Sequence, residues 1–323
     1  MKRDTLKYIL KLVFGLLIIV VILYQIRWED FFITVKKANY FLLVSAFSLL
    51  LIERVWAVFK WRQLLIVQGA AISMWRLFCI YTIGAFWGLF LPSSLGTDVA
   101  RGYYLAKSSN AAISVASVVV DRLMGILSLF FICFASIFFS NGLLEQSITN
   151  YIYIIFAAVI VGLILLLQDR VPDVLEKKIS FFSVNPIGMK LLEMHRAFLR
   201  FKKYPGTLFL AFLYSLVLQI IRVVTIYVTA LAFSINIGIE TFFVVVPVSI
   251  VVIMIPVSIG GLGVREGAFV FLFSLFGVSV NSSFVISSTN SIMVTIIGLL
   301  GGFVFMLYRD EFQGKNISKK IKL

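Results

Sequence analysis

The segment IPVSIGGLGVRE, from Ile255 to Glu266, interrupts a long apolar stretch of the chain. A proline and three glycines lie where a membrane helix would continue, and an arginine and a glutamate follow them. Proline and glycine weaken helices, and a charged residue inside a membrane is costly and usually functional. The segment therefore predicts a broken membrane helix with a functional site at the break.

The composition predicts a membrane protein. Of the 323 residues, 61% are hydrophobic, whereas soluble domains contain about 45–50%. The net charge of +14 would suggest nucleic acid in a soluble protein, but here it indicates cytoplasmic loops rich in Lys and Arg. The chain has no P-loop and no cysteine spacing typical of metal sites. We therefore expect no nucleic-acid partner, no cofactor and no metal.

Several apolar segments approach the roughly 20 residues that a helix needs to cross a bilayer. No small-residue cleavage site follows the first of them, so we expect an uncleaved span rather than a signal peptide. We predict an all-α integral membrane protein, one polytopic domain over residues 1–323. Its six full transmembrane helices are expected at about 8–26, 40–59, 111–140, 151–168, 207–235 and 284–308.

Two further apolar stretches, 77–91 and 241–257, are short for a span and typical of re-entrant segments. If residues 77–110 dip into the membrane and return to the cytoplasm, the N-terminus, the basic loop 169–206 and the basic C-terminal tail all lie inside. Lys and Arg favour the cytoplasmic side. We therefore expect two re-entrant helical hairpins, in a cell membrane protein with both termini cytoplasmic.

The two hairpins resemble each other in sequence. LPSSLGTDVAR, ending at Arg101, aligns without a gap with IPVSIGGLGVR, ending at Arg265, and both fit Pro-x-Ser-Leu/Ile-Gly-x-x-x-x-Arg. An odd number of predicted spans separates the copies, so the hairpins would enter from opposite sides as parts of inverted halves, roughly 1–150 and 151–323. Broken segments at matching places in inverted halves indicate a transporter's binding site. The alternative is a chance similarity of two Gly/Pro breaks.

Nine charged residues lie within or beside the apolar segments, and each would cost about 2.5–3.5 kcal/mol at mid-bilayer. Asp98 and Arg101 are three residues apart and predict a pair on one helix face. The other acids are adjacent in sequence to an arginine, so each is expected to find a partner on another segment. Every cation in the set is Arg, which binds phosphate or carboxylate bidentately. The set is Glu53, Arg54, Asp98, Arg101, Asp121, Arg122, Arg222, Arg265 and Glu266.

We expect an anion site at the two breaks. Arg101 and Arg265 would bind the anion, while Asp98 and Glu266 would hold these arginines and be exchanged for the ligand. Glycines let the backbone turn and expose amides, and a helix that starts there attracts negative charge. The remaining binding residues are Ser94, Gly96, Ser258, Gly260, Gly261 and Gly263.

The other charged residues are expected to line a pathway: Glu53, Arg54, Asp121, Arg122 and Arg222. The alternative is that all these pairs are structural and only hold broken helices together.

The sequence resembles the transmembrane region of lysylphosphatidylglycerol synthases and the stand-alone proteins that share it. The resemblance rests on LPSSLGTDVARGYYLAK, on VDRLMG at 120–125 and on IPVSIGGLGVREG at 255–267, and it covers nearly the whole chain. It implies movement of lipids between leaflets, or handling of lipids and polyprenyl lipids. Thr97 departs from the family, where a second glycine is expected. The 323 residues contain no aminoacyltransferase domain, so we expect no enzyme activity.

These observations together favour a flippase-like translocase for a phosphate-bearing lipid, either a phospholipid or a polyprenyl-phosphate-linked one. The expected partners are membrane lipids, above all anionic ones. Two alternatives stay open at this stage. One is a secondary transporter of a small soluble anion, and the other is a non-transporting membrane partner of a lipid-modifying or glycan-assembly enzyme.

Overall fold

The computed structural model describes residues 3–91, 95–107, 109–139, 199–255 and 257–312, and a few single positions between 150 and 168. Within these residues the chain forms helices and no strand, which confirms the all-α class. Four helices are long and apolar enough to cross a membrane. They are α3 (Tyr40–Val67), α6 (Ala111–Phe139), α11 (Pro205–Ala232) and α14 (Val280–Phe312).

These helices correspond to four of the six predicted spans. The predicted span 8–26 is α1 (Arg3–Gln25), which bends by 90° into α2 (Trp28–Lys36), and this bent pair is a fifth candidate span. The predicted span 151–168 lies outside the described residues apart from single positions. The chain is therefore a multi-pass membrane protein with four or five candidate spans in its described part.

Helix α3 is longer than predicted. A loop was expected at residues 60–76, but α3 continues through Lys60 to Val67 because no helix-breaking residue occurs before Gly69. Gly69 has φ +78°, and the Ala70 N–H donates to the Leu65 carbonyl at 3.0 Å. A glycine in this conformation is a common helix end. Lys60 therefore lies inside a membrane helix, not in a loop.

The chain forms two compact units. Unit 1 comprises Met1–Val55, Phe78–Arg101 and Leu218–Arg309, and unit 2 comprises Trp56–Leu77, Gly102–Val217 and Asp310–Leu323. Helices α3, α4, α5, α11 and α14 contribute residues to both units. Each unit contains residues from before and after position 150, so the units are not the proposed repeat halves, whose inverted relation stays a prediction.

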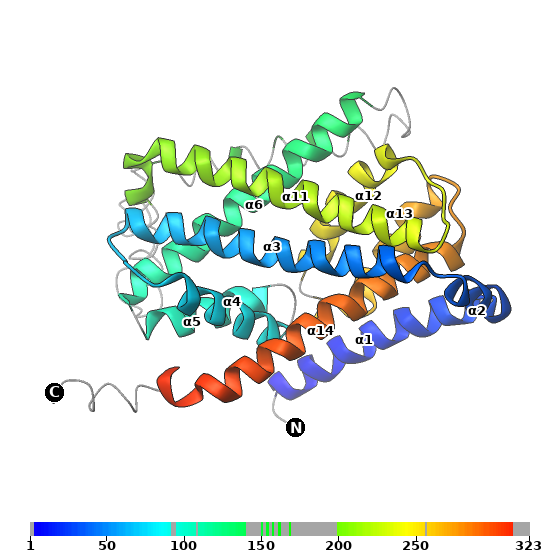
Figure 1. Ribbon diagram of the computed structural model, residues 1–323, viewed down its shortest axis with the longest axis horizontal. Coiled ribbons are helices and arrows are strands. Elements are labelled where there is room, and N and C mark those ends of the chain that lie inside the picture. Colours follow the sequence, from blue (N-terminus) through cyan, green and yellow to red (C-terminus); the bar gives the residue numbers. More distant parts are fainter. Residues whose placement is uncertain are drawn as a thin grey trace. The chain divides into compact units, whose positions relative to one another are not determined.

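Unit 1 contains both helix breaks. Helix α4 (Met74–Gly88) ends and α5 (Leu95–Ala106) begins across the first break, and α12 (Ile239–Met254) and α13 (Val264–Ser274) flank the second. Helix α13 packs against α12 and α1 (Figure 1). A buried apolar cluster that includes Val223, Phe242, Phe269, Phe273 and Ile286 joins α11, α12, α13 and α14.

Other clusters complete the core of each unit. Figure 1 shows α1 and α14 side by side, and Ile22, Ile26 and Phe284 pack where they meet. In unit 2, Leu64 and Val120 are among the buried residues that join α3, α6 and α11 to the short 3₁₀ helix η1 (Arg200–Lys203). In unit 1, helices α1, α11, α12 and α14 pack around α13 and so position the second break.

Candidate functional site

The two helix breaks contact each other in unit 1. The Gly260 N–H in the second break donates a hydrogen bond to the Leu91 carbonyl in the first, at 3.2 Å. Gly260 has φ +60°, and a Cβ atom there would lie 2.8 Å from the Leu89 carbonyl oxygen. Only glycine combines this backbone conformation with so close an approach. Two motifs from opposite halves of the chain thus come together through their backbones.

The two helices beside the first break, α4 and α5, pack closely against each other. A Cβ atom at Gly84 would lie 2.7 Å from Arg101 Cγ, and one at Gly88 would overlap the Thr97 side chain. A Cβ atom at Gly96 would overlap Leu91. Thr97, which replaces the glycine that the family pattern led us to expect, is accommodated because Gly88 leaves space for it.

The second break is a glycine turn capped by a carboxylate. Gly261 has φ +78° and Gly263 has φ +76°. Gly263 is the N-cap of α13, and its N–H donates to Glu266 Oε2 at 2.8 Å. Gly15 of α1 packs so closely on Gly263 that a side chain at position 263 would overlap the Gly15 carbonyl. The N-cap amide of α13 is therefore already bound by the chain's own carboxylate.

Arg101 on α5 is buried and paired, as the three-residue spacing predicted. Its side chain is 3% exposed, and its Nη2 donates to Asp98 Oδ1 at 2.5 Å. Its guanidinium lies over the Tyr81 ring of α4, 4.7 Å from the ring centroid. An arginine so placed is fixed by one carboxylate and one aromatic face.

Arg265 on α13 is held differently. Its Nη1 donates to Ser291 Oγ at 3.3 Å, and the Ser291 hydroxyl donates to Glu266 Oε1 at 2.5 Å. Within the described residues, Arg265 forms no ion pair. This corrects the expectation that Glu266 holds Arg265 as Asp98 holds Arg101. Glu266, at 6% exposure, instead caps α13 and accepts from Ser291 of α14.

The parts of the chain that form these breaks also identify its family. The family model for the lysylphosphatidylglycerol synthase TM region matches residues 8–302. The chain belongs to this family. No curated protein and no solved structure matches the chain. The lysylphosphatidylglycerol synthase TM region, as matched here, contains both breaks and every charged residue singled out above.

Two of the predicted pathway residues pair across helices of unit 1. Arg222 Nε on α11 donates to Glu53 Oε1 on α3 at 2.6 Å, and Arg222 Nη1 donates to Gln219 Oε1 at 3.1 Å. This confirms that Glu53 finds its partner on another segment. Arg54, next to Glu53, lies over the Tyr81 ring at 5.8 Å and has no ion-pair partner among the described residues.

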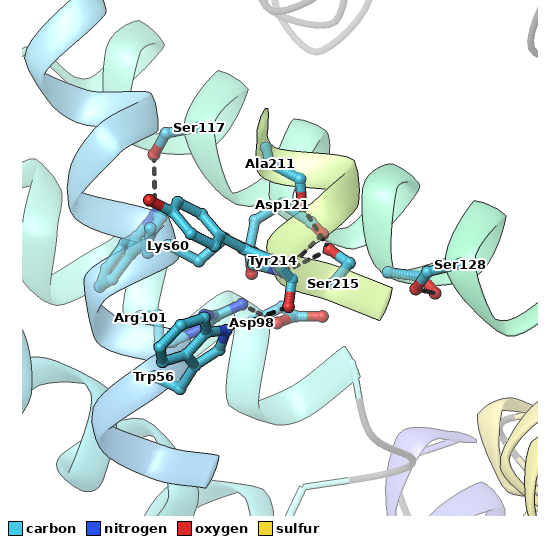
Figure 2. A network of polar contacts seen from close by, with 12 residues as sticks. Trp56, Lys60, Asp98, Arg101, Ser117, Asp121, Ser128, Ala211, Tyr214 and Ser215 are labelled. Carbon is cyan, nitrogen blue, oxygen red and sulfur yellow. Dashed lines mark hydrogen bonds and ion pairs between the residues drawn. The ribbon is translucent and has the colours of Figure 1, made fainter. Parts of the chain in front are cut away.

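Asp121 on α6 belongs to unit 2, where its partner is a lysine. Lys60 Nζ lies 2.8 Å from Asp121 Oδ1, and both side chains are less than 10% exposed. Lys60 also donates to Ser215 Oγ of α11 at 3.1 Å (Figure 2). The set of membrane cations predicted from the sequence therefore lacks Lys60. It was missed because it lies just past the predicted end of the span at residue 59.

The remaining predicted residues are placed as follows. Ser258 is buried in the second break, at 2% exposure. Arg122 is half-buried on α6 in unit 2. Ser94 lies outside the described residues, as do Pro92 and Ser93. The sequence reasoning missed Tyr81 and Ser291. The polar run SSTNS at 287–291, inside an apolar helix, was the signal for Ser291.

Proposed function

We propose that this protein binds the phosphate group of a membrane lipid at the two contacting breaks and moves it between leaflets without changing it chemically. One observation supports this most strongly. The backbone contact between Gly260 and Leu91 brings together two broken helices, and α5 contributes the buried Arg101 and α13 the half-buried Arg265 beside it. Arginine stays charged when buried and matches the geometry of phosphate.

The proposed exchange differs at the two arginines. At Arg101, a lipid phosphate would replace Asp98, which holds a single guanidinium nitrogen in the ion pair described above. At Arg265 it would replace the neutral Ser291 hydroxyl, while Glu266 stays in place as the cap of α13. The acyl or prenyl chains would remain in the bilayer, against apolar side chains exposed on α1, α3 and α14.

Neutralising Asp98 is expected to increase the amount of bound lipid. In the Asp98→Asn variant, the side chain at position 98 no longer competes as an anion for Arg101, so the gently purified protein should retain several-fold more phosphate-bearing lipid. Asp30→Asn, which makes the same change at an exposed position of α2, serves as the control. Extraction and mass spectrometry measure the lipid. If Asp98→Asn retains the same amounts of phosphate-bearing and phosphate-free lipid as wild type does, the proposed exchange of Asp98 for phosphate is refuted.

The proposed orientation places both termini in the cytoplasm of a cell membrane protein, following the distribution of Lys and Arg. Single cysteines at Asn141 and Asn185, positions outside the described residues, are expected to react with impermeant reagents from opposite sides. Cys79 and Cys133 are first replaced. Labelling of both sites from one side would remove the support for re-entrant hairpins in inverted halves.

A further inference from the structure

The buried charges of unit 1 do not balance. Each of its three buried or half-buried carboxylates is already bound. Glu53 pairs with Arg222 and Asp98 with Arg101, while Glu266 accepts from the Gly263 N–H and the Ser291 hydroxyl. The buried or half-buried arginines that the structure describes in this unit are Arg54, Arg101, Arg222 and Arg265. These four arginines exceed the three carboxylates by one positive charge, and two of them, Arg54 and Arg265, form no ion pair among the described residues.

Of these two arginines, Arg54 has the fewer partners. Its Nε is buried and has no hydrogen-bond partner, and no hydrogen bond or ion pair of its guanidinium occurs within the described part of the chain. Arg54 lies near the middle of α3, which runs from Tyr40 to Val67. At 1.5 Å per residue, it is about 20 Å from either end of the helix. An arginine at this depth is too far from both membrane surfaces for easy hydration by snorkelling.

The surroundings of Arg54 concentrate positive charge. Its guanidinium and that of Arg101 lie over the same Tyr81 ring, 5.8 and 4.7 Å from the centroid. Arg265 lies at the second break, where a Cβ atom on Gly261 would be 3.7 Å from its Nη2, and the second break is hydrogen-bonded to the first through Gly260 and Leu91. Arginines from α3, α5 and α13 thus gather around the breaks, and the tyrosine face offsets only part of the repulsion.

We propose that Arg54 is the first ligand of the phosphate group, with Arg265 as the second donor and the Arg101–Asp98 pair beside them. This inference rests on the proposed function and assigns the residue that first binds the lipid phosphate. The excess of one positive charge matches a phosphodiester, which carries one negative charge, better than a phosphomonoester, whose charge at pH 7 is about −1.5 to −2. The anion supplies the counter-charge that Arg54 lacks.

The test compares Arg54→Gln with wild type in detergent micelles. The measured quantities are binding of radiolabelled phosphatidylglycerol and the thermal stability with and without this lipid. Arg62→Gln is the matched control, because Arg62 is on the same helix but only five residues from its C-terminal end. We expect Arg54→Gln to lower the affinity by about tenfold or more, and Arg62→Gln to leave it within about twofold, since charge-assisted bonds to phosphate are strong.

Stability separates a ligand role from a structural one. A residue that holds the fold makes the lipid-free protein less stable when it is replaced. Removal of a buried charge that has no counter-charge does not weaken the fold. Lipid-free Arg54→Gln is therefore expected to melt at the same or a higher temperature than wild type. The stabilisation that lipid gives by mass action is expected to be lost. Arg54→Lys keeps the charge and is expected to bind weakly, which guards against a folding defect in the glutamine variant.

Two further arms complete the test. Competition by inorganic phosphate reveals whether the phosphate group is sufficient or the lipid tail is needed, and either result agrees with a phosphate site at Arg54. A phosphate-free glycosyldiacylglycerol is expected not to bind. Wild-type affinity and wild-type lipid stabilisation in Arg54→Gln would overturn this inference alone. If wild type itself binds no phosphatidylglycerol and no phosphate, the proposed function fails as well.

Discussion

Replacement of Lys60 by methionine is expected to destabilise the protein by about 3–5 kcal/mol, the usual cost of removing one partner of a buried ion pair. Lys60 and Asp121 are 4% and 7% exposed, and Nζ of Lys60 is the cation 2.8 Å from the Asp121 carboxylate. Methionine preserves the length of the side chain but leaves Asp121 buried without that charge. The free energy of unfolding in mixed micelles measures the effect.

Two controls isolate the ion pair. Lys36→Met removes the same charge from an exposed position at the end of α2 and is expected to change stability by less than about 0.5 kcal/mol. The double variant Lys60→Met/Asp121→Leu removes both charges and is expected to recover most of the loss, because an apolar pair often replaces a buried ion pair without cost. If Lys60→Met unfolds like wild type, the pair does not stabilise unit 2.

Conversion of Arg101 or Arg265 to lysine is expected to lower lipid exchange between leaflets by about tenfold or more while the protein still folds. A lysine keeps the charge, but its ammonium cannot make two parallel hydrogen bonds to a phosphate. Arg62→Lys is the control for the same change elsewhere on a membrane helix. Exchange is measured in vesicles, and folding by size-exclusion chromatography in detergent.

The two variants also test the difference between the arginines. A lysine at position 101 can still pair with Asp98, whereas a lysine at position 265 has only the Ser291 hydroxyl within the described structure. We therefore expect the Arg265→Lys protein to be the less stable of the two. Full exchange activity in either variant would show that a bidentate arginine is unnecessary at that position.

Local features of the site could be predicted from the sequence because they depend on nearby residues. Proline and glycine at 255–263 predicted the second break, and the three-residue spacing predicted the Asp98–Arg101 pair. The capping role of Glu266 was missed, although Gly263 and Glu266 have the spacing of a capping box. Glu266 was instead expected to hold Arg265 in the anion site, by analogy with Asp98 and Arg101.

Partners from distant segments could not be predicted, because they depend on how the helices pack. Nothing in the sequence joins Lys60 to Asp121 or Arg265 to Ser291; each contact requires two helices to lie at one particular register. The end of α3 was also misplaced, since a charged residue was taken as the end of an apolar span. The helix in fact continues to Gly69, where the backbone conformation ends it.

The most direct test of the account is lipid exchange by the wild-type protein in reconstituted vesicles. A fluorescent phosphatidylglycerol and a fluorescent glycosyldiacylglycerol without phosphate are each placed in both leaflets, and an impermeant quencher is added outside. We expect the protein to make the inner-leaflet pool of the phosphate-bearing lipid accessible to the quencher, while the phosphate-free lipid stays protected as in empty vesicles. Equal protection of the fluorescence of both lipids from the quencher, or equal loss of the fluorescence of both, would contradict the proposed function.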